Sequence, residues 1–288
     1  MKNILLLSIC AVLLAACSTV PITGRKQLSL VSNQEVMSLS LQEYDKFMQS
    51  STLSSDKANT ALVVKVGQNI ANAVGTYYKS MGMEDMLDGY TWEFHLVQAP
   101  DVNAFCMPGG KIVVYEGILP YTQNETGLAV VLGHEVAHAV AKHSNERMSQ
   151  QLVSQYGAVA LSALLSKSSA TTQQLASTVY GLGAEYGVML PFSRKQELEA
   201  DHLGLIFMAI AGYDPNQAIP FWERMSAQGG KVPEFMSTHP SDQHRIEDIQ
   251  KEIPDAIKIA NSIKGKSGGT PTPQKNNSKT TTSDEWKF

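Results

Sequence analysis

The sequence predicts an α+β domain that is mainly α-helical, with a small β-hairpin or sheet beside a buried central helix. The helix is indicated by residues 127–141, where His134, Glu135 and His138 are the only polar side chains. A helix that is apolar on nearly all sides is a buried one. Helical spacing of apolar residues recurs on both sides of this segment, and two short segments are rich in β-formers. A hydrophobic content of 43% over 288 residues is sufficient for one full core.

The chain begins with a segment typical of a signal peptide. Residues 1–3 carry a positive charge, and residues 4–16 form an almost wholly apolar run that is too short for a comfortable membrane span. Residues 14–17, Leu-Ala-Ala-Cys, resemble a bacterial lipobox, in which cleavage precedes the cysteine and the cysteine receives lipid. This predicts a signal peptide at 1–16 and lipidation of Cys17. The alternative is ordinary secretory cleavage nearby, with Cys17 a plain thiol.

The predicted lipid anchor determines the expected location. Ser18 follows the cysteine where the lipobox resemblance would place Asp to retain a lipoprotein at the inner membrane. We therefore expect an outer-membrane protein of a Gram-negative bacterium that faces the periplasm, with residues 17–32 as a lipid-anchored tether. Cys106 would be the only free thiol of the processed chain, so no intrachain disulfide is expected. Basic residues are scattered within a formal net charge of −4, which argues against nucleic acid as a partner.

Two helices and two strands are expected before the central helix. Helical spacing predicts helices at 33–48 and 56–81. Alternation predicts strands at 91–97 and 111–115, and a Gly-Gly pair before the second strand allows a tight reversal, so we expect a hairpin. The free edge of the second strand would pair with an extended substrate backbone; a plain structural strand is the alternative. The candidate substrate-binding residues are Lys111, Ile112, Val113, Val114 and Tyr115.

The second half of the chain is expected to be helical up to a polar tail. Residues 122–125, Thr-Gln-Asn-Glu, fit a capping box at the start of the central helix. Helical character continues past His143 to about residue 165. This segment and residues 173–190 are expected to form a helical hairpin on or beside the cleft. Further helices are predicted at 193–211, 216–227 and 241–263. Residues 265–288 have almost nothing to bury, so we expect a disordered tail there and a catalytic domain at 33–264.

Two histidines of the central helix have the spacing of a zinc site. His134 and His138 are i, i+4, which places their side chains about 40° apart on one face, and Glu135 lies about 100° from His134. This is the geometry of two imidazoles on one Zn²⁺ with a carboxylate beside the reactive water. We predict His134 and His138 as metal ligands, Glu135 as the general base, and one Zn²⁺ per chain. His143 lies about 140° from His138 on a continuous helix, so it is not expected in the ligand set.

The third ligand of a catalytic zinc is expected from another helix. Glu197 and Asp201 are i, i+4 and share a face, whereas Glu199 lies about 200° from Glu197. The residues alone therefore leave two choices: Glu197 with Asp201, or Glu199 with His202.

Four segments resemble one family of zinc metallopeptidases. They are residues 103–110 (Asn-Ala-Phe-Cys-Met-Pro-Gly-Gly), the helix with His134, Glu135 and His138, residues 193–201, and residues 237–240 (Ser-Thr-His-Pro) with Arg245. The chain resembles the gluzincin family that includes the type I CAAX prenyl endopeptidase, the bacterial heat-shock membrane protease, the Oma-type mitochondrial protease and the β-barrel assembly-enhancing proteases. The resemblance implies a gluzincin-type metallopeptidase domain of the lipid-tethered rather than the integral-membrane type.

The same resemblance implies roles for three further residues. Glu197 becomes the third metal ligand, and Asp201 the group that orients a ligand histidine, a role whose loss typically costs 10–100-fold in affinity or activity. His239 would stabilise the tetrahedral intermediate or contact substrate, and would occupy the open metal position at rest. The alternative for His239 is a loop histidine packed beside Pro240.

These predictions together indicate a zinc-dependent endopeptidase. Unfolded or misassembled envelope polypeptides are the expected substrates, because backbone pairing carries little sequence preference. Family analogy suggests periplasmic and outer-membrane protein quality control, with an outer-membrane assembly machinery as a further candidate partner. One alternative is a zinc-containing periplasmic chaperone or assembly factor with secondary or latent proteolysis, and another is a scaffold lipoprotein with a vestigial site. Glu135 argues against a purely structural zinc, which needs no general base.

Overall fold

The computed structural model describes residues 17–20, 23–164, 166, 174, 190–227, 234–239 and 243–267. Its helices are α2 (Asn33–Ser50), α3 (Lys57–Ser80), α4 (Leu119–Thr122), α5 (Glu125–Val140), α6 (His143–Leu164), α8 (Leu190–Ala211), α9 (Ala218–Ser226), α10 (Glu234–Thr238) and α11 (Gln243–Ser267). Its strands are β1 (Cys17–Thr19), β2 (Lys26–Leu28), β3 (Glu93–Val97), β4 (Ala104–Met107) and β5 (Lys111–Tyr115). Long helices with two small sheets confirm the predicted α+β, mainly helical class.

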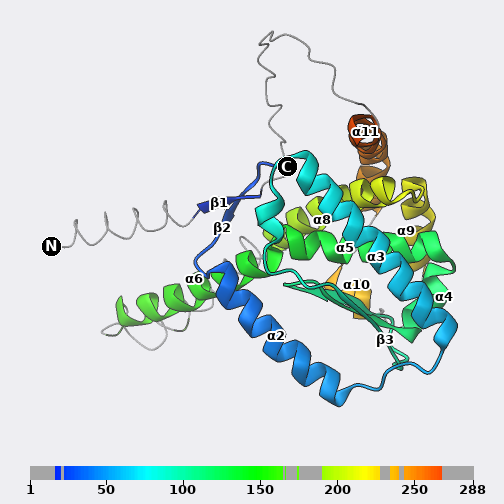
Figure 1. Cartoon of the computed structure of the whole chain (residues 1–288). Coiled ribbons are helices and arrows are strands. Elements are labelled where there is room, and N and C mark those ends of the chain that lie inside the picture. The colour runs from blue at the N-terminus through cyan, green and yellow to red at the C-terminus, as the bar shows by residue number, and fades with distance from the viewer. Residues whose placement is uncertain are drawn as a thin grey trace, which may run out of the picture.

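Helix α5 lies at the centre of the molecule, packed against α3, α8 and the three-stranded sheet (Figure 1). Leu128, Val131, Leu132 and Val136 of this helix are all 0% exposed. Burying an aliphatic side chain of this size stabilises a fold by about 1.5–3 kcal/mol. The prediction of a buried central helix is therefore confirmed, and packing around its circumference holds the helix rigidly.

Two glycines let α5 and α8 approach each other closely. A Cβ atom on Gly204 would lie 3.0 Å from the backbone nitrogen of His134 and 3.1 Å from the carbonyl carbon of Gly133. Ordinary van der Waals contact needs more room than this, so a side chain at Gly204 would push the helices apart. Because the contact is made at His134, the spacing of the two helices also sets the position of that imidazole.

Gly204→Val is expected to destabilise the fold by about 1–3 kcal/mol, because the added side chain overpacks the contact between α5 and α8. Chemical denaturation followed by circular dichroism would measure the change. Gly75→Ala is the matched control, since a Cβ on this glycine of α3 meets no atom within 4 Å. The control should stabilise the helix by about 0.5–1 kcal/mol. Equal stability of Gly204→Val and the parent chain would contradict close packing at this point.

The three-stranded sheet has the order β3-β5-β4, which differs from the predicted hairpin. Strand β3 pairs with β5 in parallel, and β4, which was not predicted, pairs with β5 antiparallel. The hairpin is thus formed by β4 and β5, whose turn contains Gly109 and Gly110 with φ of 92° and 88°. The positions of the strands at 91–97 and 111–115 were predicted correctly. Their pairing was not, because alternation reports which face is buried and not which strand is the neighbour.

The sheet lies between the central helices and α2, so that both of its faces are covered (Figure 1). Tyr44 of α2 forms a separate buried cluster with Val97 and Val113 on the side away from α5. Ile112 and Val114, the alternate residues of β5, belong to the main core instead. This arrangement buries β5 in the middle of the fold and leaves β4 at an edge.

Both ends of α5 differ from the sequence prediction. Its N-cap is Asn124, whose side chain accepts a hydrogen bond from the Gly127 N–H at 2.9 Å, so the predicted capping box at 122–125 is wrong. The hydroxyl of Thr122 donates instead to the Leu119 carbonyl at 3.0 Å. Helical character was expected to continue past His143, but α5 ends at Val140. Lys142 then adopts a left-handed φ of 61°, which breaks the helix and redirects the chain into α6.

The segment predicted as a tether is folded onto the domain. Strands β1 and β2 form an antiparallel two-stranded sheet, and the connection between them places Arg25 in contact with Glu146 of α6 and Glu199 of α8. At the other end of the chain α11 runs to Ser267, past the predicted start of the tail. The packed unit therefore extends beyond residues 33–264 on both sides.

Several predictions fall on residues that the structure does not describe. These are the signal peptide at 1–16, most of the predicted helix at 173–190, and the tail from residue 268. In the described part of the chain, no helix combines the length and the apolar character needed to cross a membrane.

Candidate metal centre

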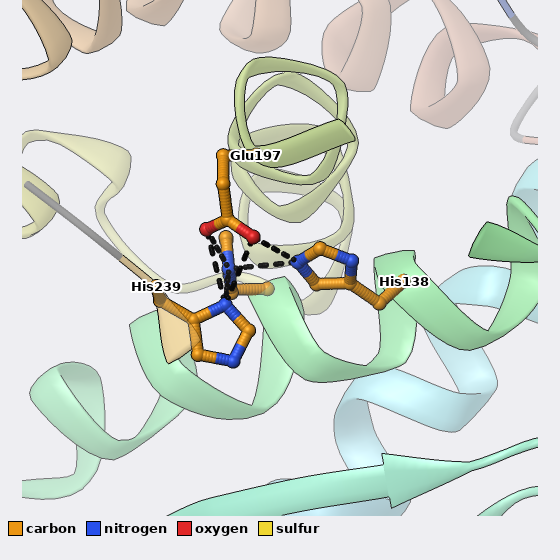
Figure 2. A group of neighbouring side chains, drawn as sticks. His138, Glu197 and His239 are labelled. Carbon is orange, nitrogen blue, oxygen red and sulfur yellow. Dashed lines mark hydrogen bonds and ion pairs between the residues drawn. The ribbon is translucent and has the colours of Figure 1, made fainter. Parts of the chain in front are cut away.

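Four side chains meet beside the central helix. They are His134 and His138 from α5, Glu197 from α8, and His239, which directly follows α10. One candidate ligand atom from each lies within 4.8 Å of the others, so the group can hold a metal ion. Figure 2 shows His138, Glu197 and His239 pointing toward one another from separate elements. The structure thus brings together the three predicted metal ligands and His239, which was expected at the open metal position at rest.

The distances within this group are short. The Nε2 atoms of His134 and His138 are 3.0 Å apart, and His239 Nδ1 lies 3.1 Å from His134 Nε2. The Glu197 carboxylate lies 3.3 Å from both His134 Nε2 and His138 Nε2, and 3.0 Å from His239 Nδ1. Three imidazole nitrogens and a carboxylate therefore surround one point.

The donor chemistry of the group fits a cation. His134 Nδ1 lies 2.9 Å from Asp201 Oδ1, and because an ionised carboxylate only accepts, this nitrogen carries the proton. In the neutral imidazole the lone pair then lies on Nε2, which faces the Nε2 of His138. Lone pairs that converge at such distances repel each other unless a positive charge lies between them. Nitrogen and carboxylate oxygen donors of this kind are the usual ligands of zinc.

Asp201 is itself held in place by Arg245. The Arg245 Nε and Nη2 atoms donate to the two Asp201 oxygens at 2.7 and 2.9 Å, and its guanidinium stacks on Trp222 with 3.8 Å to the ring centroid. Burial alone would raise the pKa of Asp201, but Arg245 and His134 hold it below its usual value. Asp201 therefore stays ionised and accepts from His134 Nδ1, the contact that the role implied for it by the resemblance would need.

Glu135 lies next to the ligand group without joining it. Its Oε1 is 3.3 Å from His239 Nε2 and, among the residues that the structure describes, has no hydrogen-bond partner. Burial raises the pKa of Glu135, and the N–H of Cys106 opposes this as a hydrogen-bond donor. A buried carboxylate with a raised pKa is suited to accepting and releasing a proton near neutral pH.

The electrostatics of the ligand group favour a positive charge at its centre. Burial alone would lower the pKa of His134, but Asp201 and Glu197 outweigh it and raise that pKa to about 9. Burial alone would raise the pKa of Glu197, yet the surrounding histidines, His138 first, hold it well below its usual value. Burial also holds the pKa of His138 well below its usual value, so this ring stays in the neutral form that binds metals.

The structure resolves the choice that the residues alone left open in the second helix. Glu197 and Asp201 face the site, whereas His202 Nδ1 pairs with Glu252 at 2.8 Å on α11. Glu199 is outside the ligand group and accepts from His143 Nε2 at 2.9 Å. The pairing of Glu199 with His202 is therefore not formed.

Sequence reasoning missed the role of His143. It was placed away from the site on the assumption of a continuous helix, but the break at Lys142 brings its Nδ1 to 2.7 Å from His138 Nδ1. His143 and Glu199 are 2% and 0% exposed. One general rule could have suggested this contact. A buried histidine and a buried carboxylate each need a polar partner, and His143 and Glu199 provide one for each other.

The predicted substrate strand does not have a free edge. Residues Lys111 to Tyr115 form β5, which is paired with β3 on one side and β4 on the other. The ammonium of Lys111 is bonded to Glu93 and Thr91. Pairing of β5 with a substrate is therefore excluded. The edge strands are β3 and β4, and the outer side of β3 is already bonded to residues 52–54. Cys106, in this edge strand, has a thiol whose pKa is raised by burial and by the nearby Glu135.

Comparison with known proteins finds that the chain is similar to several that are named as metalloendopeptidases or proteases. It is 44% identical over 178 residues to the mitochondrial metalloendopeptidase OMA1 of Schizosaccharomyces pombe, covering 61% of this chain and 49% of that protein. It is 32% identical over 248 residues to the mitochondrial metalloendopeptidase OMA1 of Homo sapiens, covering 83% and 46%. It is 30% identical over 185 residues to the β-barrel assembly-enhancing protease of Escherichia coli, covering 60% and 38%. The chain spans about half the length of the OMA1 relatives.

These relatives contradict the predicted location. Identities of 44% and 40% are to mitochondrial proteins of Schizosaccharomyces pombe and Arabidopsis thaliana, whereas the bacterial β-barrel assembly-enhancing proteases match at 32% and 30%. The expectation of a Gram-negative outer-membrane protein facing the periplasm is therefore wrong. It came from the lipobox resemblance and Ser18 alone, which report on processing of the leader and not on the folded domain. The partnership with an outer-membrane assembly machinery stays a prediction.

The family itself is shown by the match that covers the site. The description Peptidase family M48 fits residues 59–253, more than half of the chain, and this span contains every side chain of the ligand group together with Glu135 and Asp201. The chain belongs to peptidase family M48.

Proposed function

We propose that the chain is a zinc-dependent endopeptidase with one Zn²⁺ held by His134, His138 and Glu197. The observation that carries the proposal is the convergence of these side chains within 4.8 Å of one another, with the buried carboxylate of Glu135 beside them. Three protein ligands and a general base are typical of a catalytic zinc, whereas a structural zinc is closed by four ligands. The metalloendopeptidase relatives support the same conclusion.

Each residue of the site has a defined task in peptide hydrolysis. Zinc supplies Lewis-acid activation of water and of the scissile carbonyl. Glu135 takes a proton from the attacking water and passes it to the leaving amine. Asp201 keeps His134 oriented with Nε2 toward the ligand group. Exclusion of bulk water from these buried groups strengthens every charge interaction among them.

We propose two states for His239. A catalytic zinc needs one open position, yet four side chains converge here, so one of them must withdraw before substrate enters. His138 and Glu197 project from long packed helices, whereas His239 follows a helix of only five residues. His239 therefore occupies the fourth place at rest. After withdrawing it contacts the substrate or its developing oxyanion, for which its Nε2 beside Glu135 is well placed.

Extended polypeptide is the substrate class that fits the edge of β4. The Tyr115 N–H donates to the Asn103 carbonyl and the Gly110 N–H to the Met107 carbonyl, so alternate residues of β4 face β5. Ala104 and Cys106 therefore direct their main-chain groups away from β5. Their N–H groups donate to the Asn103 side chain and to Glu135, and a pairing substrate would replace these two bonds. A substrate backbone paired there would reach the metal ligands without any demand on its side chains. Unfolded or misassembled proteins are the chains that offer such segments, and their removal is the proposed task.

Peptides N-methylated at single backbone positions should test this pairing. Methylation at positions that bond to β4 is expected to lower kcat/KM by about 10-fold, the equivalent of about 1.4 kcal/mol. Methylation at the intervening positions should have little effect, because those amides point away from the strand. The measurement is a set of kcat/KM values for one peptide methylated in turn along its length. A uniform loss at all positions would contradict strand pairing.

The proposed activity itself is tested with the purified chain and an unfolded protein such as casein. Cleavage should stop on addition of a zinc chelator and return when zinc is restored. A folded, compact protein of similar size is the control and should resist cleavage, since it offers no extended segment. Cleavage that persists after complete removal of metal would overturn the proposal.

We also propose that a lipid on Cys17 attaches the chain to a membrane. Its support is the Leu-Ala-Ala-Cys sequence at 14–17. Mass spectrometry of the N-terminal peptide should show cleavage before Cys17 and an added lipid mass. An unmodified Cys17, or cleavage elsewhere, would disprove the anchor without touching the proposed chemistry.

A further inference from the structure

The turn between β1 and β2 inserts an arginine into the interior of the domain. The side chain of Arg25 is 8% exposed, and those of Glu146 and Glu199 are 0% exposed. Arg25 donates through both terminal nitrogens to the two Glu146 oxygens at 2.9 and 2.8 Å, and through Nε to Glu199 at 2.7 Å. The hydroxyl of Thr23 also donates to Glu199. A segment far from the metal ligands in sequence thus holds a carboxylate near them.

This carboxylate is connected to the metal centre through His143. His143 Nε2 lies 2.9 Å from Glu199, and His143 Nδ1 lies 2.7 Å from His138 Nδ1. Because the carboxylate only accepts, His143 Nε2 carries a proton, and in the neutral ring Nδ1 is then an acceptor. His138 Nδ1 must therefore donate, which leaves the lone pair of His138 on Nε2, the atom that faces Glu197 and His134.

The two histidines of α5 are supported in parallel ways. His134 is backed by Asp201, which Arg245 holds. His138 is backed by His143, which contacts Glu199. Arg25 holds this carboxylate as Arg245 holds Asp201. Groups that orient a metal-bound histidine fix its tautomer and ring position, and their loss typically costs 10–100-fold in metal affinity. The N-terminal turn is therefore part of the apparatus that shapes the site.

We infer that Arg25 is a positioning residue for the metal centre, acting through Glu199 and His143 on His138. The inference rests on the proposed zinc site. It differs from a simple structural role, in which Arg25 only compensates two buried charges. A structural role predicts lower stability of the metal-free chain, whereas positioning predicts weaker metal binding and altered ligand geometry.

The test measures zinc affinity of the full chain by competition with a chromophoric chelator, and the absorption spectrum of the Co²⁺-loaded chain. Arg25→Gln is expected to weaken zinc binding by about 10-fold and to change the Co²⁺ spectrum. Thr23→Val, which keeps both ion pairs of Arg25, should shift both readouts in the same direction by less. Lys26→Gln is the matched control, because Lys26 is exposed on the same hairpin, and it should change neither.

A double-mutant cycle shows whether Arg25 acts through His143. His143→Ala alone should weaken zinc binding by about 10–100-fold. Arg25→Gln added to that background should have little further effect, because the connection is already broken. An undiminished effect of Arg25→Gln in the His143→Ala chain would overturn the inference. So would an Arg25→Gln chain with lower thermal stability but unchanged zinc affinity and Co²⁺ spectrum.

The same experiment separates the inference from the proposed function. If the parent chain bound no zinc, or bound it equally well without His134, the zinc site itself would be wrong. If the parent chain bound one zinc tightly, and Arg25→Gln and Thr23→Val bound zinc with the same affinity, only the positioning role of Arg25 would be disproved.

Discussion

Replacing Glu135 with Gln is expected to abolish peptide cleavage while leaving the metal bound. The amide has nearly the same size and shape as the carboxylate but cannot accept the proton of the attacking water. Loss of a general base typically lowers the rate by about 10²–10⁴-fold. The other carboxylate of α5, Glu125, lies in its first turn and is paired with Lys65, so it cannot take over this role. Cleavage of unfolded casein and zinc content per chain would be measured on the same preparation.

Glu223→Gln is the control for this experiment, because Glu223 is exposed on α9. It should leave both cleavage and zinc content unchanged. Full activity of Glu135→Gln would show that the peptidase interpretation is wrong. An inactive Glu135→Gln chain that still prevented aggregation of unfolded proteins as well as the parent would favour the chaperone alternative.

Glu197→Ala is expected to remove the metal itself. Glu197 supplies the only carboxylate of the ligand group, and it offsets the positive charge that would gather among the three imidazoles. Its loss should weaken zinc binding by more than about 100-fold, since loss of an outer partner alone costs 10–100-fold. Zinc retained after dialysis against a chelator, determined by elemental analysis, would fall from one per chain to nearly none.

One further variant and one further measurement make the Glu197 result specific. Glu223→Ala should keep one zinc per chain, which excludes an effect of removing any glutamate. Circular dichroism of Glu197→Ala should show intact helices, because α8 is packed through Leu203, Ile206 and Phe207, all 0% exposed. A folded Glu197→Ala chain with undiminished zinc affinity would contradict the proposed ligand set.

The sequence was most informative where one local pattern determines the geometry. The i, i+4 spacing of His134 and His138 on an apolar helix requires that both rings lie on one face, and the structure has them there. The choice of Glu197 over Glu199 came only from the family resemblance, because helical angles alone do not say which face of α8 meets α5. The face of α8 that meets α5 depends on how the two helices pack, and the close approach at Gly133 and Gly204 is part of that packing.

The wrong predictions concern features that depend on a contact between distant residues or on a single backbone angle. Strand periodicity could not show that β3 runs parallel to β5. The left-handed conformation of Lys142 turned an expected continuous helix into two and brought His143 to His138. The N-terminal segment looked like a tether because its contacts with the domain join residues far apart in sequence, such as Arg25 with Glu146 and Glu199, 121 and 174 positions away. No local pattern reports such a pair.

The buried arginine of the N-terminal hairpin also determines how much of this polypeptide can be studied in isolation. The family match begins at residue 59, and an excised fragment starting there would lack Arg25. Glu146 and Glu199 would then lose their buried arginine partner, and breaking a buried pair typically costs about 3–5 kcal/mol. That is a large share of the 5–15 kcal/mol that holds an ordinary domain together. The autonomous unit of this metallopeptidase therefore includes Arg25, well upstream of residue 59, where the family match begins.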